Sequence, residues 1–141
     1  MEKDDQCAIK GILNMKWVPV LLIFVPCIAG AAHWKKVFED YEYVVSIDTD
    51  SIERSGESVR SWVQQRFIKR RLSGADAYNI LNGLNSFDCK SKKVSLVQVD
   101  VYLDDKAVAS HKAGNMGGDR LIIPGTVEYF AYRNLCPTKK D

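Results

Sequence analysis

The chain has 141 residues, of which 20 are Lys or Arg and 18 are Asp or Glu, so its net charge is +2. This near balance argues against an obligate nucleic-acid binder and against a strongly acidic partner. No internal repeat or low-complexity tract is present. The length without its apolar N-terminal segment suits one domain with a single modest core.

Residues 1–32 have the arrangement of a secretory signal peptide. Lys16 precedes an apolar run over residues 17–32 that ends in small residues, with a cut expected after Ala31 or Ala32. The run has about 16 residues and contains two prolines, whereas a membrane-spanning helix needs about 20 apolar residues. We therefore expect cleavage, no permanent membrane span, and export to the periplasm, the cell surface or the medium.

Three alternatives to this interpretation of the leader stay open. The apolar run is only slightly too short for an uncleaved anchor. Cys27 would be a lipid-attachment site, but Phe24, Val25 and Pro26 stand where such sites have small residues. Translation starting at Met15 would explain the mixed charges of residues 1–14, and we favour that start.

Residues 33–141 are the expected mature domain, and they contain two cysteines, Cys89 and Cys136. Two cysteines in an exported chain have one intramolecular pairing. A disulfide closing a loop of about 47 residues would stabilise the domain by roughly 4 kcal/mol. Two free buried thiols or an intermolecular link are the alternatives.

Alternating apolar and polar residues predict several strands in the first half of this domain. The clearest covers residues 41–48, after a short strand at 34–38. Residues 52–54 and 58–68 form the arms of a hairpin with Gly56 at its tip. The apolar face of the first of these strands would consist of Tyr41, Tyr43, Val45 and Ile47.

Residues 69–86 show no clear period, and we interpret them as an exposed connection with a short helical turn at 75–81. Residues 94–103 alternate strongly, with Val97, Val99, Val101 and Leu103 on one face. A turn then leads into residues 107–111, which complete a second hairpin.

The C-terminal part predicts a loop at residues 114–119, a short strand at 121–123 and one amphipathic helix. Thr126 is the expected N-cap of that helix, which ends at Cys136. Its buried face would consist of Val127, Phe130, Ala131, Asn134 and Leu135. The predicted fold class is α+β: an antiparallel β-sheet with one face covered by a C-terminal helix, linked by one disulfide.

The ordered set of these segments resembles the bacterial surface-adhesin protein E domain. The resemblance rests on Trp34, on residues 43–52 with Gly56 and 59–63, on Phe87-Asp88-Cys89-Lys90, and on the ends of residues 123–136. It implies a small envelope or surface protein of Gram-negative bacteria, whose named member binds host matrix and plasma proteins. It implies no particular ligand-contact residues, because the matching positions belong to strand cores, turns and the cysteine pair.

No catalytic, cofactor or metal site is predicted. His111 lacks a nucleophile motif beside it, and His33 lies at the expected mature terminus. Asp48 and Asp50 suit a turn better than a calcium loop, which needs a glycine and a later glutamate. The glycines of residues 114–118 lack the lysine of a P-loop.

Basic residues supply the best candidate binding patch, and they fall in two segments of the chain. If the two segments lie side by side, they would bind acidic polymers, acidic lipid head groups or acidic stretches of a protein; a solvated face is the alternative. The patch consists of Arg66, Lys69, Arg70, Arg71, Lys90, Lys92 and Lys93. An exposed aromatic patch of Trp62, Tyr102, Tyr129 and Tyr132 is a further alternative, although core packing is the default.

The expected function is that of an exported, non-enzymatic binding protein with a host or envelope protein as partner and without a nucleic acid. A periplasmic inhibitor or immunity-like protein that acts on an enzyme is the first alternative. A small secreted hydrolase is the second, disfavoured because no nucleophile, base or metal ligands come together in the sequence. An exposed edge strand would permit a dimer.

Overall fold

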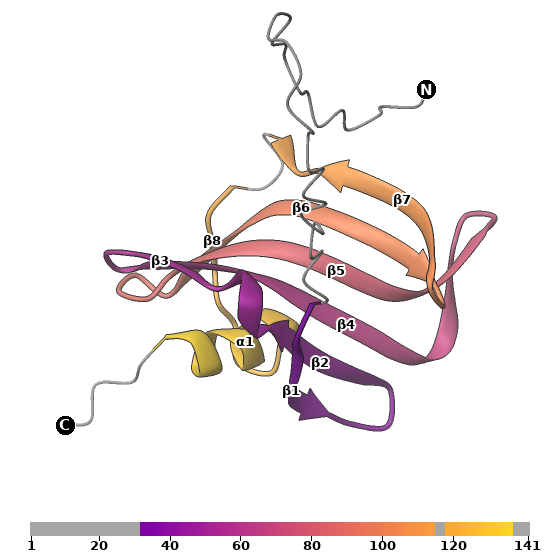
Figure 1. Ribbon diagram of the computed structural model, residues 1–141, viewed down its shortest axis with the longest axis horizontal. Coiled ribbons are helices and arrows are strands. Elements are labelled where there is room, and N and C mark those ends of the chain that lie inside the picture. Colours follow the sequence, from indigo (N-terminus) through magenta and orange to yellow (C-terminus); the bar gives the residue numbers. More distant parts are fainter. Residues whose placement is uncertain (1–31, 115–117, 137–141) are drawn as a thin grey trace, which may run out of the picture. The chain divides into compact units, whose positions relative to one another are not determined.

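The computed structural model describes residues 32–114 and 118–136. These contain eight strands, one 3-10 turn and one helix (Figure 1). The predicted leader and the predicted cut lie almost wholly outside the described residues. The elements are β1 (Trp34–Glu39), β2 (Tyr43–Asp48), η1 (Thr49–Ser51), β3 (Glu53–Ser55), β4 (Ser58–Ser73), β5 (Asp76–Asp88), β6 (Lys93–Leu103), β7 (Lys106–Lys112), β8 (Arg120–Leu121) and α1 (Val127–Leu135).

All strands belong to one antiparallel sheet with the order β1-β2-β4-β5-β6-β7. The short strand β3 pairs with the start of β4, and β8 pairs with the start of β6. Tight turns join neighbouring strands, and Gly56 (φ 58°) and Gly74 (φ 63°) supply the left-handed backbone that two of these turns need. The predicted α+β class, with its antiparallel sheet, is confirmed.

The segment 69–86 is mostly strand, so the expectation of an exposed connection with a helical turn is wrong. β4 continues to Ser73 and β5 begins at Asp76. The pairing passes from Arg66 opposite Ile80 to Arg71 opposite Tyr78, so residues 67–70 bulge from the ladder. Extra residues in one strand bend a hairpin and break its alternation, which explains why the sequence pattern is lost here.

A smaller bulge changes the predicted face of β6. Leu84 lies opposite Gln98 and Asn85 lies opposite Leu96, which leaves Val97 without a partner in β5. Because one extra residue reverses the alternation, Val97 is out of phase with Val99.

The face predicted for residues 41–48 also needs correction, since Tyr41 lies before β2 and is 86% exposed.

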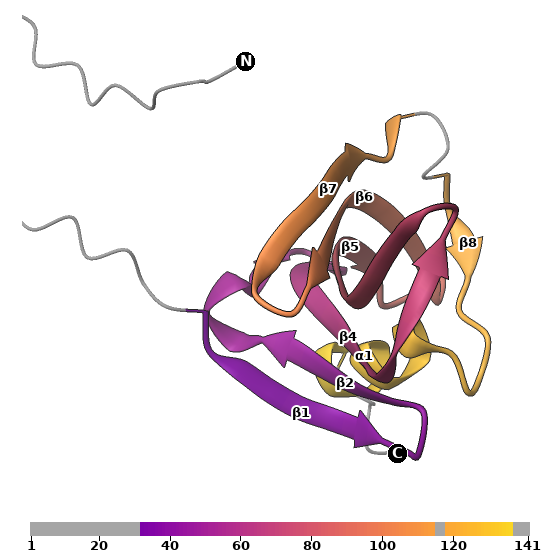
Figure 2. The same ribbon diagram turned by 90° about the vertical axis from the view of Figure 1, so that its right-hand side faces the viewer.

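Helix α1 covers one part of the sheet and leaves another part open. It packs on β1, β2 and β4, and Figure 2 shows it on the side of the curved sheet away from β7. The core lies between these elements and includes the ends of β5 and β6. Its buried residues are Val45, Ile47, Val59, Val63, Phe87, Val94, Ala131, Leu135 and Cys136.

The helix begins as the sequence predicts. The Thr126 hydroxyl accepts a hydrogen bond from the Tyr129 N–H at 3.3 Å, which caps the first turn. The predicted buried face is correct at Ala131 and Leu135 and wrong at Asn134, which is exposed and donates to the Phe130 carbonyl. Tyr132 packs against the core instead.

A disulfide joins Cys89 to Cys136, with 5.5 Å between the two Cα atoms. The bond ties the C-terminal end of α1 to the turn after β5, so the predicted pairing is confirmed. Two further contacts hold the same corner together. The Tyr132 hydroxyl donates to the Cys89 carbonyl at 3.1 Å, and the Arg54 guanidinium donates to the Leu135 carbonyl at 2.9 Å.

Candidate binding surfaces

A hollow of about 370 Å³ lies on the helix-side face of the sheet, beside the N-terminal end of α1. Strands β4, β5 and β6 supply its floor, while β8 and the first turn of α1 supply a wall. Its floor includes the apolar residues Val63, Leu81, Leu96 and Val99. An apolar hollow with a few polar groups is the usual form of a small binding site.

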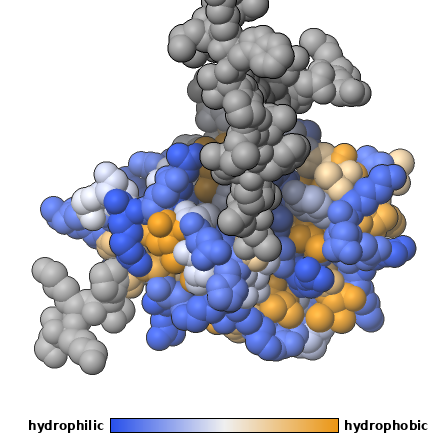
Figure 3. Space-filling view, viewed as in Figure 1, coloured by the Kyte–Doolittle hydropathy of each residue, from blue (hydrophilic) through white to orange (hydrophobic). Residues whose placement is uncertain are grey.

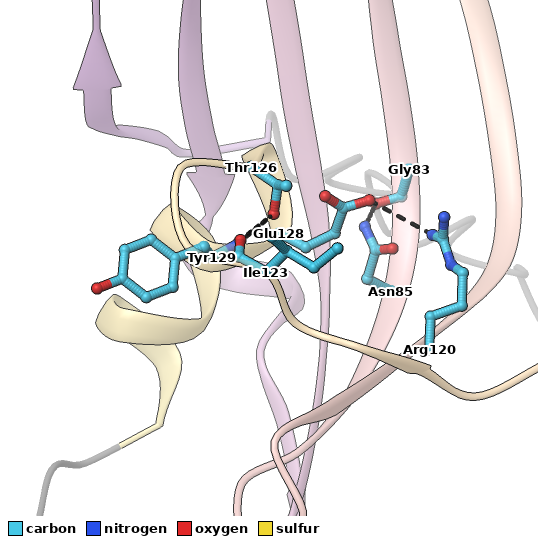
Figure 4. Close-up of polar contacts among 7 residues, drawn as sticks. All are labelled: Gly83, Asn85, Arg120, Ile123, Thr126, Glu128 and Tyr129. Atoms are coloured by element: carbon cyan, nitrogen blue, oxygen red, sulfur yellow. Dashed lines mark hydrogen bonds and ion pairs between the residues drawn. The ribbon is translucent and has the colours of Figure 1, made fainter.

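Gly83 and Asn85 shape the middle of this floor (Figure 4). The Asn85 side-chain amide donates to the Gly83 carbonyl at 3.1 Å, and Asn85 is only 6% exposed. A Cβ atom on residue 83 would lie 3.0 Å from the Asn85 amide nitrogen and 3.4 Å from a Leu96 methyl carbon. Glycine therefore keeps both the hydrogen bond and the depth of the hollow.

An ion pair stands at the rim of the hollow. Arg120 of β8 and Glu128 of α1 approach to 3.4 Å (Figure 4). The Arg120 side chain is 57% exposed and the Glu128 side chain 28%. Because Arg120 is largely exposed, the pair contributes little to stability.

A second hollow of about 310 Å³ continues the first toward β7 and shares Leu81 and Val99 with it. Its other apolar residues include Val101, Val108 and Ala109. We call the two hollows together the open groove. Because α1 packs on β1, β2 and β4, the helix does not cover this part of the sheet.

The opposite face of the sheet also has a hollow against β7, with a volume of about 320 Å³. Its floor includes Gln98 and Tyr102 of β6, and its side includes Ala107 and Ser110 of β7. The small side chains of β7 explain both hollows, since alanine and serine leave space that larger residues would fill. Val108 and Ala109 contact the hollow on each face.

The two basic segments do not form one patch. Arg66 to Arg71 lie at the bulge of β4, whereas Lys90, Lys92 and Lys93 follow the other end of β5. The pairs Arg66–Ile80 and Ser58–Asp88 are eight residues apart along β4, which is about 26 Å of strand. The seven predicted residues therefore belong to two separate surfaces, and a binding role for either stays a prediction.

The surface at the bulge of β4 combines cations with exposed apolar side chains. Tyr41, Ile68 and Leu72 are 86%, 59% and 77% exposed. Tyr41 and Ile68 line a hollow of about 310 Å³ together with Lys69 and Arg70. Figure 3 shows apolar side chains between hydrophilic ones on the side of the molecule where this hairpin ends. We call this surface the hairpin patch: Tyr41, Ile68, Lys69, Arg70, Arg71 and Leu72.

Two of the arginines in the hairpin patch have acidic neighbours. Arg70 pairs with Asp104 at 2.9 Å, and Arg71 pairs with Glu42 at 3.6 Å. The Arg71 guanidinium also lies 5.0 Å from the centre of the Phe67 ring. All of these charged side chains are about half exposed, so the ion pairs leave them accessible.

The histidines and the Asp48–Asp50 pair show no catalytic arrangement. The Asp48 carboxylate accepts from the Asp50 N–H at 3.2 Å and from the His33 N–H at 3.0 Å, which is the expected turn-stabilising role. His111 is exposed on β7 at the end of the open groove. Among residues 32–114 and 118–136, no three His, Cys, Asp or Glu residues are arranged to hold a metal ion.

Two groups have shifted pKa values. Partial burial, helped by the Asp40 and Glu42 carboxylates, raises the pKa of the Tyr43 phenol, which lines the first hollow. Hydrogen bonds from Ser91 and from the Lys90 N–H lower the pKa of the Asp88 carboxyl. Neither shift supplies an acid or base for catalysis at neutral pH.

Sequence reasoning missed the open groove and the apolar residues of the hairpin patch. The open groove depends on which strands α1 covers, and no local sequence pattern predicts which strands these are. Ile68 and Leu72 could have indicated the hairpin patch, because large apolar residues within a run of cations are unusual in a solvated loop. The aromatic patch is not borne out as a surface, because Trp62, Tyr102, Tyr129 and Tyr132 are all partly buried.

The fold and these surfaces define a small disulfide-linked domain of one curved sheet and one helix, with hollows suited to binding. The model of the family described as "Surface-adhesin protein E" matches residues 34–137, so the chain belongs to that family. The resemblance noted in the sequence is thereby confirmed. The family's description is that of a surface adhesin.

No curated protein and no solved structure matches the chain. In the part of the chain that the structure describes, no helix is long and apolar enough to cross a membrane.

Proposed function

We propose that this chain is an exported, non-enzymatic envelope or surface protein that binds host or extracellular proteins through the hairpin patch. The observation that carries the proposal is the position of exposed Tyr41, Ile68 and Leu72 beside accessible cations at one end of the sheet. Exposed apolar groups among charges are typical of protein-binding surfaces. The family match supports binding as the mode of action.

The cations and the apolar groups would have different roles in this surface. Lys69, Arg70 and Arg71 would attract acidic stretches of a partner and speed association, an effect that salt screens. Ile68 and Leu72 would supply the contact area that water leaves on binding. Binding should therefore weaken with salt without disappearing.

The test uses the protein recovered from a Gram-negative host that expresses the whole gene. Its non-reduced intact mass and cell fraction come first, since a periplasmic or surface species starting at Ala32 or His33 would support the predicted export. An uncut or lipid-bearing species in the membrane fraction would contradict the predicted cleavage.

Binding is then measured on immobilised plasma and extracellular-matrix proteins. We expect the triple variant K69E/R70E/R71E to bind about tenfold more weakly at physiological salt, because it reverses three charges of the hairpin patch. The matched control is K90E/K92E/K93E, which makes the same charge change at the other end of the sheet. Equal binding by the two triple variants would remove the hairpin patch from the proposal.

A further inference from the structure

The outer edge of β7 has no strand beside it in the described part of the chain. β7 is the last strand of the sheet and pairs only with β6. Six of its seven residues are exposed. An edge of this kind presents unpaired N–H and C=O groups that can accept another strand.

The backbone groups at this edge follow from the pairing with β6. The Ala113 N–H donates to the Val97 carbonyl at 2.9 Å, and hydrogen-bonded and non-bonded pairs alternate along an antiparallel ladder. His111 and Ala109 therefore point their backbone groups toward β6. Ser110 and Lys112 point theirs outward, at the open edge.

The other edge of the sheet is different. β1 has a bulge between Lys36 and Phe38, which interrupts its regular pairing. The Phe38 ring stacks on Phe130 of α1 with 3.7 Å between ring centres, so β1 is fixed to the helix. β7 also has a bulge, at Val108, but its residues 109–112 pair regularly with β6. β7 has no comparable contact with the helix, and six of its seven residues are exposed.

Hollows flank β7 on both faces of the sheet. One has about 310 Å³ on the helix side, and the other has about 320 Å³ on the opposite side. Side chains of an added strand alternate between the two faces. They would enter both hollows in turn, which is how strand addition gains specificity beyond its backbone hydrogen bonds.

The charges of β7 identify the kind of strand that fits. Lys106 and Lys112 stand at its two ends, and the residues between them are small or apolar apart from His111. A second copy of β7 in antiparallel pairing would bring Lys106 of each chain toward Lys112 of the other, and like charges across strands are unfavourable. A partner strand with an acidic residue at each end would be favoured instead.

We propose that β7 accepts an extended segment of another protein as an additional antiparallel strand, with apolar side chains in the middle and acidic side chains facing Lys106 and Lys112. This inference goes beyond the proposed function, because it uses a different surface from the hairpin patch. It stands even if the hairpin patch binds nothing.

The test uses a defined peptide and the isotope-labelled protein recovered from the whole-gene expression host. The probe has seven residues, alternating valine and threonine in the middle and a glutamate at each end, and is capped at both termini. We expect binding to slow hydrogen exchange at the Ser110 and Lys112 amides, which are exposed to water in the free protein. The amides that already bond β6 should change little.

Two matched controls separate strand addition from simple charge attraction. A peptide with lysines in place of the glutamates should bind about tenfold more weakly, and so should the acidic peptide to the variant K106E/K112E. Alternate N–H groups of the peptide face β7, and the others face away from it. N-methylation of the set that faces β7 should abolish binding. N-methylation of the other set should leave binding nearly unchanged.

Three results with the peptide would overturn the inference: no binding of the acidic peptide, exchange protection at β1 instead of β7, or equal effects of N-methylation on both edges of the peptide. A dimer of the free protein that protects the Ser110 and Lys112 amides would also overturn it, because a second copy would then be the occupant. The variant K69E/R70E/R71E should bind the peptide normally, which keeps this test distinct from that of the hairpin patch.

Discussion

The helix-covered part of the sheet and its open part contain similar apolar residues, but these residues are buried in the first part and partly exposed in the second. Under α1, Val45, Phe87 and Leu135 are fully buried and the disulfide closes the corner. In the open groove, Leu81, Val99 and Val101 belong to the same sheet face but keep part of their surface exposed. The difference shows that one part of the sheet can supply stability while the other keeps apolar surface for a partner.

The disulfide should make the largest single contribution to the stability that the helix-covered part supplies. We expect the double variant C89A/C136A to lose about 4 kcal/mol of unfolding free energy, because the bond closes a long loop of the unfolded chain. Urea unfolding followed by tryptophan fluorescence measures the loss. Reduction of the native protein should reproduce it.

A small loss of stability in C89A/C136A would mean that the packing of α1 alone holds the covered part. The comparison would then rest on the core residues, and the disulfide would have a role other than stability.

The same substitution, leucine to alanine, can be made in the helix-covered part and in the open groove to compare what each part contributes to stability. Leu135→Ala in the covered part should cost about 3 kcal/mol, since a fully buried side chain leaves a cavity. Leu81→Ala in the open groove should cost about 1 kcal/mol, since its side chain is already partly in water. Urea unfolding of both variants gives the difference.

Equal costs for the two leucines would break the comparison, because they would show that something covers the open groove in solution. A ligand or partner carried through purification would be the first explanation to examine, by native mass spectrometry.

The smallest effect concerns Asp88, the last residue of β5, which lies beside Cys89. Its pKa is lowered in the folded protein, so its carboxylate stabilises the fold above the unfolded pKa of about 4. That contribution is lost as the pH falls through the lowered folded pKa. The urea midpoint of D88N should therefore lie below that of the native protein at pH 7, and the gap should shrink below pH 4.

The control for Asp88 is D105N, in the turn between β6 and β7. The Asp105 carboxylate makes no hydrogen bond within residues 32–114 and 118–136, so its variant should show no comparable gap at pH 7. A constant gap for D88N between pH 7 and pH 3 would contradict the role given to its charge.

The candidate surfaces were only partly predictable. The cations at Lys69, Arg70 and Arg71 were visible as a run in the sequence, but their separation from Lys90 to Lys93 was not. Adjacent strands of a hairpin put residues near each other according to register, and the register here depends on the bulge at residues 67–70. Both hollows beside β7 were invisible, because they arise where α1 is absent and where β7 carries small side chains.

The sequence by itself determined the antiparallel strands with regular alternation, the turn at Gly56, the start of α1 at Thr126 and the pairing of Cys89 with Cys136. These features depend on local chemistry or on there being one possible partner. Only the tertiary structure decided the bend of the long β4–β5 hairpin, the phase of Val97 and the face of the sheet that stays open. Those features depend on how the whole sheet curves and on where one short helix lies, and contacts between distant residues set both.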